Sequence, residues 1–396
     1  MEIEFKIFTL NCWGIPVVSK DIKPRMQSIA EHLVATSYDM VCLQEVWTES
    51  DYNLVRDKVR GSYPYSHYFY SGVIGSGVCV FSKHLLQDVF FHQWPVNGYI
   101  HKFQHGDWFA GKGIAMCRVV VGGYNINIYT SHLLAEYNRI CDEYETHRMI
   151  QAYDTAQFIQ LTSAAADLAI LAGDLNTEPG DLPHKVLMSV TGFNDAYIEA
   201  ESEAQEPFYT NDGPHNTYTA PSLLKKNYPG KRIDYILYNC GSNTSVEMKK
   251  YCRPLPNRVP GCEYSYSDHE AITATLLLKK SEGLPKTCDV SSRATVLTEC
   301  IDMCNIALNT LLNHKRVYWF LTALLSLILI TTVAMDSLFG KAILIHIVRV
   351  VVTILLGFTF IMATAWNRIE RHAVIAGKLA MEVTLKQYVD NGKREF

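Results

Sequence analysis

The stretch "LAILAGDLNTEPGD" at residues 168–181 begins as an apolar run and ends in a Pro-Gly turn signal. A short apolar run bounded by turn residues is typical of a buried β-strand, here 168–174. Asp174 and Asn176 stand on either side of Leu175. Because side chains alternate along an extended chain, we expect Leu175 to enter the core while its two polar neighbours face one rim together. The competing interpretation is an Asx-type turn.

Strand and helix patterns alternate through the first 280 residues. β-Branched runs and period-two alternation predict further strands near 3–11, 39–45, 76–82, 113–121, 124–132, 232–238 and 270–278. Helical spacing of apolar residues predicts helices over 22–36, 50–60 and 138–163. Together these elements predict a mixed sheet architecture with outer helices.

Polar side chains recur where the predicted strands begin or end. They are Asn11, Glu45, His132, Asp174, Asn176, Asp268 and His269. Taken singly, each has an ordinary structural interpretation: a turn residue, an ion pair or a hydrogen-bonded histidine. Strand ends line a common rim, so residues far apart in sequence can converge there. The joint occurrence of these residues therefore favours a catalytic site.

Six short motifs carry a family resemblance. In chain order they are "LNCWG", "LQEVW", "SHL", "GDLN", "RIDYIL" and "SDHEA". Over residues 3–278 they resemble the endonuclease/exonuclease/phosphatase superfamily, which implies an α+β, DNase I-like four-layer sandwich of two packed mixed sheets flanked by helices. The stretches "YFYSGVIGSGVCVFSKH" (68–84) and "HGDWFAGKG" (105–113), with "HLLAEYN", more closely resemble the neutral sphingomyelinases.

The resemblance implies a metal-assisted phosphodiester hydrolysis. Mg²⁺ prefers oxygen ligands and keeps several waters. Glu45 is the first expected ligand, with Asn11 as a neutral partner and Asp268 contributing, and Mn²⁺ is the expected substitute for Mg²⁺. A carboxylate supplies charge where an amide supplies only geometry, so Glu45→Gln should be far more damaging than its change of shape suggests.

The resemblance also implies the proton-transfer and phosphate-binding roles. His269 is expected to be the general base on the attacking water, because imidazole titrates near working pH. Asp234 matches the position that orients this histidine. Asp174 is expected to position the water or to donate a proton. Asn176 is expected to hold a phosphate oxygen, and His132 to be a second hydrogen-bond donor to the phosphate. Whether Asp174 or His269 takes the proton stays open.

"HGDWFAGKG" has two interpretations. By resemblance to neutral sphingomyelinases, Asp107 and Lys112 form a paired site near the substrate, where Lys112 can contact phosphate. Trp108 and Phe109 would then suit a bilayer interface, where aromatic rings are common. The alternative is an ordinary surface loop with a solvated salt bridge. "SGVIGSG" does not have Walker-loop spacing, and a glycine-rich turn is its favoured interpretation.

The chain changes character after residue 280. We expect a catalytic domain over 1–280, a linker and juxtamembrane segment over 281–314, two membrane spans within 315–367, and a tail over 368–396. The spans, about 318–335 and 342–366, are apolar and long enough to cross a bilayer as a hairpin. A helix buried in a soluble core is the alternative for each.

Charge predicts the orientation of these spans. Lysines and arginines flank the pair at Lys315, Arg316, Arg368 and Arg371, whereas the connection between the spans offers only Lys341. The positive-inside rule then places both flanks, and with them the catalytic domain, in the cytosol. An endoplasmic-reticulum or nuclear-envelope location is what the resemblance implies.

The predicted activity is Mg²⁺-dependent, phospholipase C-type hydrolysis of sphingomyelin to ceramide and phosphocholine. Alternatives are a related enzyme acting on lysophosphatidylcholine-like lipids or inositol phosphosphingolipids, a nuclease, and an inactive membrane scaffold. The net charge of −4 and the absence of a large basic cluster disfavour nucleic acid as a partner. The intact set of polar residues argues against a scaffold. An anionic lipid is the expected kind of activator, and no oligomeric state is predicted.

Overall fold

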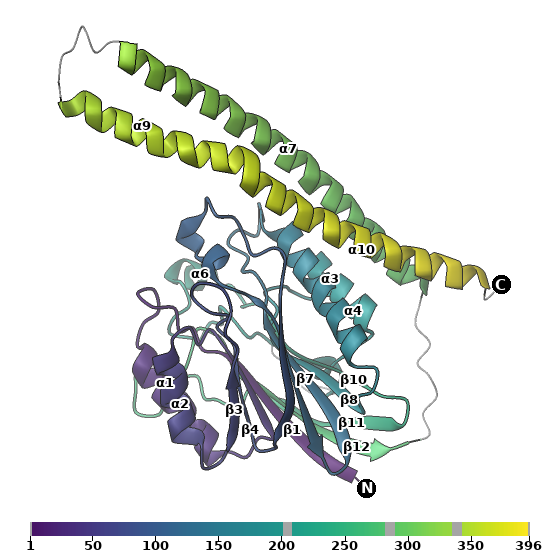
Figure 1. Cartoon of the computed structure of the whole chain (residues 1–396). Coiled ribbons are helices and arrows are strands. Elements are labelled where there is room, and N and C mark those ends of the chain that lie inside the picture. The colour runs from purple at the N-terminus through teal and green to yellow at the C-terminus, as the bar shows by residue number, and fades with distance from the viewer. Residues whose placement is uncertain (1, 201–207, 282–289, 335–342, 395–396) are drawn as a thin grey trace. The chain divides into compact units, whose positions relative to one another are not determined.

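The computed structural model describes residues 2–200, 208–281, 290–334 and 343–394. It divides into two compact units, Met1–Val296 and Leu297–Phe396. In the first unit, strands form two six-stranded sheets (Figure 1). One sheet has the order β11 (Thr244–Cys252), β12 (Ile272–Lys280), β1 (Glu2–Asn11), β2 (Met40–Gln44), β4 (Cys79–Ser82) and β3 (Tyr65–Tyr68). The other has the order β5 (Leu86–Gln93), β6 (Gly113–Val121), β7 (Tyr124–His132), β8 (Leu168–Asp174), β10 (Asp234–Cys240) and β9 (Asn194–Asp195).

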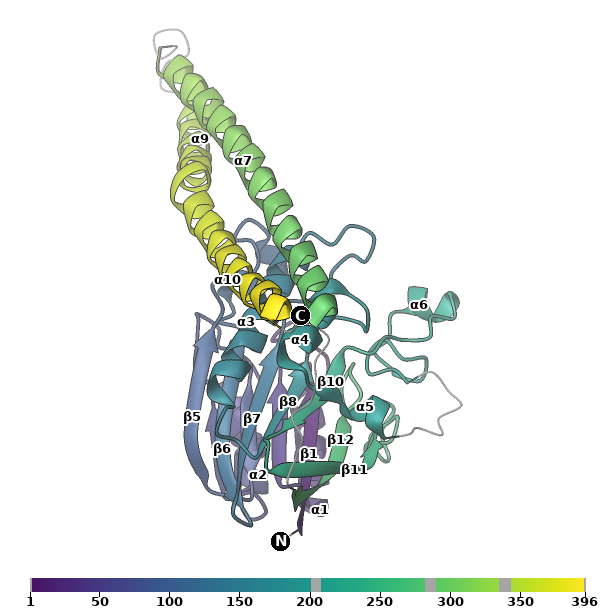
Figure 2. The ribbon, with the colours of Figure 1, turned by 90° about the vertical axis from the view of Figure 1, so that its right-hand side faces the viewer.

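The two sheets pack face to face and enclose an apolar core. A pair of helices covers the outer face of each sheet. β-Branched and aromatic side chains such as Phe5, Ile128 and Ile236 fill that core without exposure to solvent, and each buried aliphatic side chain stabilises the fold by about 1.5–3 kcal/mol. Helices α1 (Ile22–Ala35) and α2 (Glu49–Val59) cover the outer face of the first sheet. Helices α3 (Glu145–Thr162) and α4 (Leu182–Thr191) pack side by side over the second (Figure 2). The predicted four-layer sandwich is confirmed.

Several elements differ from the sequence prediction. Strands β3, β5, β9 and β11 and helix α4 were not expected. Helix α3 begins at Glu145 rather than at 138, because an Asx turn at Asn138 and a second one at Asp142 occupy the segment before it. The short helices α5 (Ala196–Glu199) and α6 (Pro221–Lys225) and the single turns Phe103–His105 and Asp107–Phe109 complete the unit.

Strand direction brings the predicted polar residues to one rim. β1 is parallel to β2 and β7 is parallel to β8, so the carboxyl ends of each pair lie together. β10 runs antiparallel to β8, and therefore its amino end reaches the same rim as the carboxyl end of β8. In register, His132 pairs with Asp174 and Asp174 pairs with Asp234. Three candidate catalytic residues are thus lateral neighbours on adjacent strands.

The second unit is helical. α7 runs over Val290–Ala334, and α9 (Ile343–Ile361) continues through a π-helical turn at Met362–Trp366 into α10 (Asn367–Arg394). Part of the segment expected as a linker is therefore helical, whereas residues 282–289 and the connection 335–342 lie outside the described residues. Thr322 Oγ1 donates to Thr359 Oγ1 at 3.1 Å. Asn367 Nδ2 likewise donates to the Leu311 carbonyl at 2.8 Å, so the helices pack antiparallel.

Both helical segments are long and apolar enough to span a membrane. The candidate spans fall within Ser292–Ala334 and Ile343–Asp390, with mean hydropathy of 2.1 and 2.3 in their most apolar windows. Only 6% and 11% of these windows are buried, unlike the core helix of a soluble domain. Arg349, a charged residue within the apolar α9, donates to the Thr332 carbonyl of α7 and so has a polar partner.

Candidate active site

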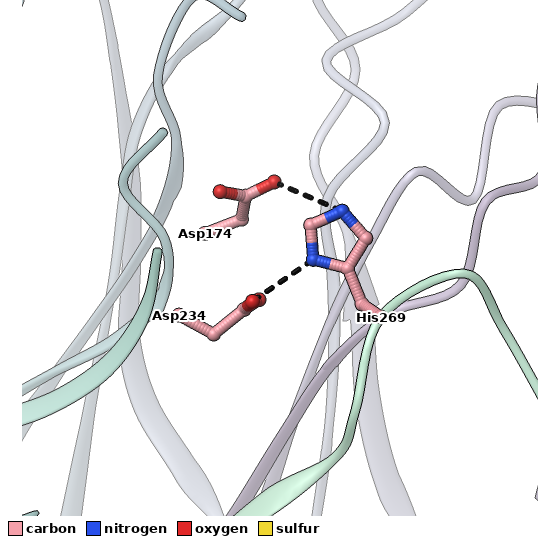
Figure 3. Close-up of side chains that lie close together, drawn as sticks. All are labelled: Asp174, Asp234 and His269. Carbon is pink, nitrogen blue, oxygen red and sulfur yellow. Dashed lines mark hydrogen bonds and ion pairs between the residues drawn. The ribbon is translucent and has the colours of Figure 1, made fainter. Parts of the chain in front are cut away.

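His269 and Asp234 form the most directly bonded pair of the rim. His269 Nδ1 lies 2.9 Å from Asp234 Oδ2, and its other nitrogen, Nε2, lies 3.8 Å from Asp174 Oδ2 (Figure 3). Because Asp234 accepts the Nδ1 proton, Nε2 is left as the atom that can take a proton from a ligand. The pKa of His269 is depressed by burial but raised further by Asp234 and Asp174, and it ends well above its usual value.

Backbone contacts fix the loop that carries His269. Ser267 Oγ donates to the Asn11 carbonyl at 2.6 Å and accepts the His269 amide proton at 3.3 Å. The loop before β12 is therefore tied to the end of β1, so that Asp268 and His269 stand next to the first sheet. His269 is only 8% exposed, which leaves one edge of the ring accessible.

Asn11 bridges two carboxylates across the sheets. Its Nδ2 donates to Glu45 Oε1 at 3.1 Å and to Asp174 Oδ2 at 2.9 Å, while its Oδ1 accepts the Trp13 amide. Glu45 follows β2 in a left-handed conformation with φ of 56°, an arrangement uncommon for a non-glycine residue. Gly14 makes it possible, because a Cβ at Gly14 would lie 2.3 Å from the Glu45 carbonyl oxygen.

The donor set fits a divalent cation. Glu45 Oε2 is buried and has no hydrogen-bond partner among the described residues, and burial raises the pKa of this carboxyl. Burial, with Glu45 nearby, also raises the pKa of Asp268 to about 6. Buried carboxylates without a cationic partner are costly, and a divalent ion offsets that cost. Glu45 and Asp268 are the oxygen donors available for it, whereas Asn11 in this orientation holds the carboxylates in place through its NH₂ group.

A second grouping of possible ligands has a different explanation. Asp174, Asp234 and His269 offer donor atoms within 4.8 Å of one another. The Nδ1 atom of His269 and one Asp234 oxygen are already engaged in the hydrogen bond between them. This hydrogen bond leaves the trio with fewer free donor atoms for an ion, whereas Glu45 Oε2 has no partner among the described residues.

His132 and Lys112 line the other side of the rim. Lys112 Nζ, almost fully buried, lies 2.9 Å from Asp107 Oδ1 and 3.4 Å from His132 Nε2. Burial, helped by Lys112, lowers the pKa of His132 well below its usual value, which favours the neutral imidazole. Tyr137 donates to the other Asp107 oxygen at 2.6 Å. The Asp107–Lys112 pair is therefore a buried pair beside the rim, and the alternative of a solvated surface salt bridge is wrong.

The opening motif combines both of its interpretations. The Asn176 amide donates to Asp174 Oδ1 at 2.9 Å, which is an Asx turn. Asn176 Nδ2 also donates to the Leu133 carbonyl, and its φ is 46°. Leu175 is fully buried, as expected. The turn is thus the device that aims both polar side chains at the rim.

One cavity of about 770 Å³ collects the predicted residues. The predicted site residues that line it are Glu45, Asp107, Lys112, His132, Asp174, Asn176, Asp268 and His269. Asn11 and Asp234 stand behind this surface, each bonded to a lining residue. Apolar side chains, including Trp13, Ile15 and Ile74, make up much of the remainder, together with polar residues such as Glu136 and Lys231. A polar floor with an apolar mouth suits an amphipathic ligand.

Arg25 is a buried residue that the sequence prediction missed. Its guanidinium is fully buried and donates to the carbonyls of Cys12, Trp13 and Tyr266 at 2.6, 2.7 and 3.2 Å, and to that of Lys20 through Nε. It therefore ties the loop after β1 to the loop that leads into His269. A signal was present, because position 25 falls on the apolar stripe of helix 22–36, four residues before Ile29.

The endonuclease/exonuclease/phosphatase family matches residues 8–269. The chain belongs to this family. A Drosophila melanogaster protein provisionally named neutral sphingomyelinase is 37% identical, with 97% of each chain covered. Human sphingomyelin phosphodiesterase 2 is 41% identical over 71% of this chain and 66% of its own. Within the family, the chain is thus a member of the neutral sphingomyelinases.

More distant matches mark the limits of that likeness. The inositol phosphosphingolipids phospholipase C of Schizosaccharomyces pombe is 31% identical over 70% of this chain and 69% of its own. Among solved structures, Staphylococcus aureus beta toxin with bound magnesium ions has a TM-score of 0.53 at 18% identity, covering 69% of this chain and 99% of its own. At that identity the structural match shows the shared fold and leaves the substrate to other arguments.

Proposed function

We propose that this chain hydrolyses sphingomyelin to ceramide and phosphocholine at a membrane surface, as a divalent-cation-dependent phosphodiesterase. The observation that carries the proposal is the cavity in which the His269–Asp234 pair, Asp174, His132 and the partly unbonded Glu45 carboxylate meet. Its apolar mouth suits a lipid, and its polar floor suits a phosphodiester. The named relatives, of which the Drosophila melanogaster protein matches 97% of the chain and the human protein 71%, supply the lipid class.

His269 is the base in this proposal. Its Nε2 accepts a proton from water as the water oxygen forms a new bond to phosphorus, and Asp234 holds the ring in the required tautomer and stabilises the resulting imidazolium. Asp174, 3.8 Å from Nε2, positions the water. The bond from phosphorus to the ceramide oxygen breaks, and that oxygen takes a proton from solvent water, while the His269 imidazolium returns its proton to solvent and completes the cycle.

The donors on the opposite wall bind the phosphodiester. Neutral His132, Asn176 and Lys112 line the cavity and each carries an N–H group, so in this proposal they hold the non-bridging phosphate oxygens. Lys112 is oriented by Asp107, whose second oxygen is bonded to Tyr137. Glu45 and Asp268 would hold Mg²⁺, or Mn²⁺ in its place. That ion would supply positive charge to the developing phosphorane-like state.

The membrane arrangement is part of the proposal. We infer that α7 and α9 cross an intracellular membrane as a hairpin, with the catalytic domain and the tail from residue 368 on the cytosolic side. The supporting observations are the two poorly buried apolar helices and the basic residues that flank them. Tethering keeps the enzyme at the surface that contains its substrate. An endoplasmic-reticulum or nuclear-envelope location and an anionic lipid activator remain predictions of this proposal.

The test uses purified, detergent-solubilised full-length protein. Sphingomyelin, lysophosphatidylcholine, inositol phosphoceramide and plasmid DNA are offered separately with Mg²⁺ or with EDTA, and released products are measured. We expect phosphocholine from sphingomyelin, dependent on Mg²⁺ and lost in His269→Ala. Preferential release from the lysolipid or the inositol lipid would correct the headgroup, and cleavage of DNA alone would reject a lipid substrate.

A folded control separates chemistry from damage to the fold. His84 forms a similar pair with Asp39, with 2.8 Å between His84 Nε2 and Asp39 Oδ1, but does not line the cavity. His84→Ala should therefore retain the activity that His269→Ala loses. Equal loss in both variants would remove the support for a specific base.

A further inference from the structure

Three loops border the cavity, and each presents aliphatic side chains to solvent at its tip. Ile15 and Pro16 of the first, Ile74 of the second and Tyr137 of the third line the cavity. The exposed aliphatic residues of these loops are Val17, Val18, Val73, Ile74 and Ile140. Val17 and Ile140 are essentially fully exposed, and Val73 is 80% exposed. Single exposed aliphatic residues are ordinary, but a set gathered around one opening is not.

The first loop is built to hold its tip outward. The Ile15 amide donates to Ser19 Oγ at 3.0 Å, and the Ser19 amide donates back to the Ile15 carbonyl at 2.9 Å. These bonds close the loop around Val17. Val17 has φ of 71°, in the left-handed region that is strongly disfavoured for a β-branched residue. The fold therefore sustains backbone strain at the position where it exposes a valine.

The second loop is anchored beside the Asp107–Lys112 pair. The amides of Val73 and Ile74 both donate to the Phe109 carbonyl, at 3.1 and 3.3 Å. Gly72 pairs with Ala110, and its backbone approaches Gly111 so closely that a Cβ on Gly72 would lie 2.3 Å from the Gly111 nitrogen. The glycine-rich turn therefore presents its two aliphatic residues from a fixed backbone, next to the segment expected from sequence to meet a bilayer.

In the third loop the charged Arg139 is paired with another residue, and the tip is the aliphatic Ile140. Asn138 Oδ1 accepts the amides of Ile140 and Cys141, which forms an Asx turn. Arg139, next to Ile140, makes two bonds to the Asp181 carboxylate at 2.8 and 2.9 Å. The carboxylate therefore neutralises the positive charge of Arg139. Ile140, at the tip, is 98% exposed.

We propose that these three tips form a lipid-contacting rim that seats the mouth of the cavity on the bilayer, a role that rests on the proposed function above. Val17, Val73 and Ile140 would enter the interfacial region. There, aliphatic side chains leave water and the lipid phosphodiester lies level with the mouth of the cavity. The rim is continuous with the apolar mouth, so a substrate would pass from bilayer to cavity without crossing water. A bilayer fits three separate small tips better than one protein groove would.

The test compares two substrates on the same full-length protein reconstituted in phosphatidylcholine vesicles. One substrate is sphingomyelin in the vesicles, and the other is a water-soluble aryl ester of phosphocholine. The variant combines Val17→Ser, Val73→Ser and Ile140→Ser, which spares every cavity-lining residue. Its matched control is Leu161→Ser. Leu161 is 79% exposed near the carboxyl end of α3, which leads into the amino end of β8, whereas Asp174 lies at the opposite, carboxyl end of that strand.

We expect the triple variant to lose about tenfold or more of its rate on vesicle sphingomyelin while it hydrolyses the soluble ester at the wild-type rate. Leu161→Ser should match the wild type on both substrates. An unchanged vesicle rate, or an equal loss on both substrates, would overturn the lipid-contacting rim. A wild-type protein that cuts neither substrate would instead contradict the proposed function.

Discussion

The unbonded oxygen of Glu45 leads to a prediction at the scale of one residue. Glu45→Gln keeps the shape of the side chain and its bond to Asn11 but removes the charge that would hold a divalent cation. We expect kcat to fall by about 10³-fold or more. Without added metal the variant should be at least as stable as the wild type, because a buried carboxylate with an unbonded oxygen is costly.

Thermal unfolding with and without Mg²⁺ checks this prediction independently of activity. The wild type should gain in Tm when Mg²⁺ is added, because the ion binds only the folded state, and Glu45→Gln should lose most of that gain. Glu49→Gln, at the start of α2 outside the cavity lining, serves as the matched control and should keep it. A full Mg²⁺ response in Glu45→Gln would move the metal site away from Glu45.

The His269–Asp234 pair predicts a change in pH dependence. Asp234 and Asp174 raise the pKa of His269 against the effect of burial. A base works in its neutral form, so activity should rise with pH through the pKa of His269. Asp234→Asn removes one negative charge and lowers that pKa, so the acidic limb of the pH–rate profile should move to lower pH. At its optimum the variant should lose about 10²-fold or more in kcat, because the ring is no longer held in its tautomer.

The same pH profile decides between the two candidate bases. If Asp174 takes the proton, the acidic limb belongs to a carboxyl group, whose pKa is raised by burial and by Asp234. His269→Ala would then retain an acidic limb. Asp39→Asn, which removes the carboxylate beside His84, controls for a general change in charge and should leave the profile unchanged.

At the residue scale, the sequence predicted which side chains would converge better than it predicted the hydrogen bonds between them. Asp174, Asn176 and His132 converge as expected, because strand alternation and parallel pairing dictate where their side chains emerge. The NH₂ contacts of Asn11 were not predictable, since they depend on two carboxylates from different sheets meeting in space. The raised pKa of Asp268 likewise follows from burial, which a motif does not encode.

At the scale of elements, Arg25 predicts how loop geometry supports catalysis. Arg25→Lys keeps the charge but cannot reach all the carbonyls that the guanidinium joins across the two loops. We expect a loss of about 1.5–3 kcal/mol in stability. Well below the Tm, we expect kcat to fall by about tenfold with KM for a soluble substrate nearly unchanged, since Arg25 positions Asn11 and His269 through these loops and does not itself line the cavity.

The split between kcat and KM distinguishes positioning from simple stabilisation. If Arg25 only stabilised the fold, the folded variant would turn over at the wild-type rate. Arg56→Lys, on exposed α2 with its guanidinium bonded to Asp57, should change neither quantity. A second variant, Arg25→Met, removes the charge as well and should lower kcat at least as far.

The four strands that the sequence did not reveal all lie at the edges of the two sheets. β3 and β9 are four and two residues long, too short for an alternation signal. β5 is an edge strand whose side chains are mostly partly or fully exposed on both faces, so "LQDVFFHQ" carries no period of two. Central strands such as β8, buried on both faces, were predicted with accurate bounds because a continuous apolar run has few alternatives.

At the scale of the whole molecule, the chain has two parts. One is the sandwich with its polar candidate site, and the other is a helical hairpin that composition alone identifies. The hairpin was predictable because length and hydropathy decide it. The start of α7 at Val290 was not, because the polar turns before the span form a helix only in continuity with it. The bounds of the domains and of the membrane spans stay predictions of composition.

The proposed topology makes a prediction that needs no activity. Asn243-Thr244-Ser245 is an acceptor triplet for N-glycosylation, and Asn243 is exposed in the turn between β10 and β11. If the catalytic domain faces the cytosol, Asn243 should carry no glycan in cells. A long acceptor-bearing peptide inserted in the connection 335–342 should be glycosylated, because that connection would face the lumen. Treatment with a glycosidase, followed by electrophoresis, reads out both sites in one chain. A glycan at Asn243 together with an unmodified insertion would invert the orientation, and the lipid leaflet available to the cavity would then be the lumenal one.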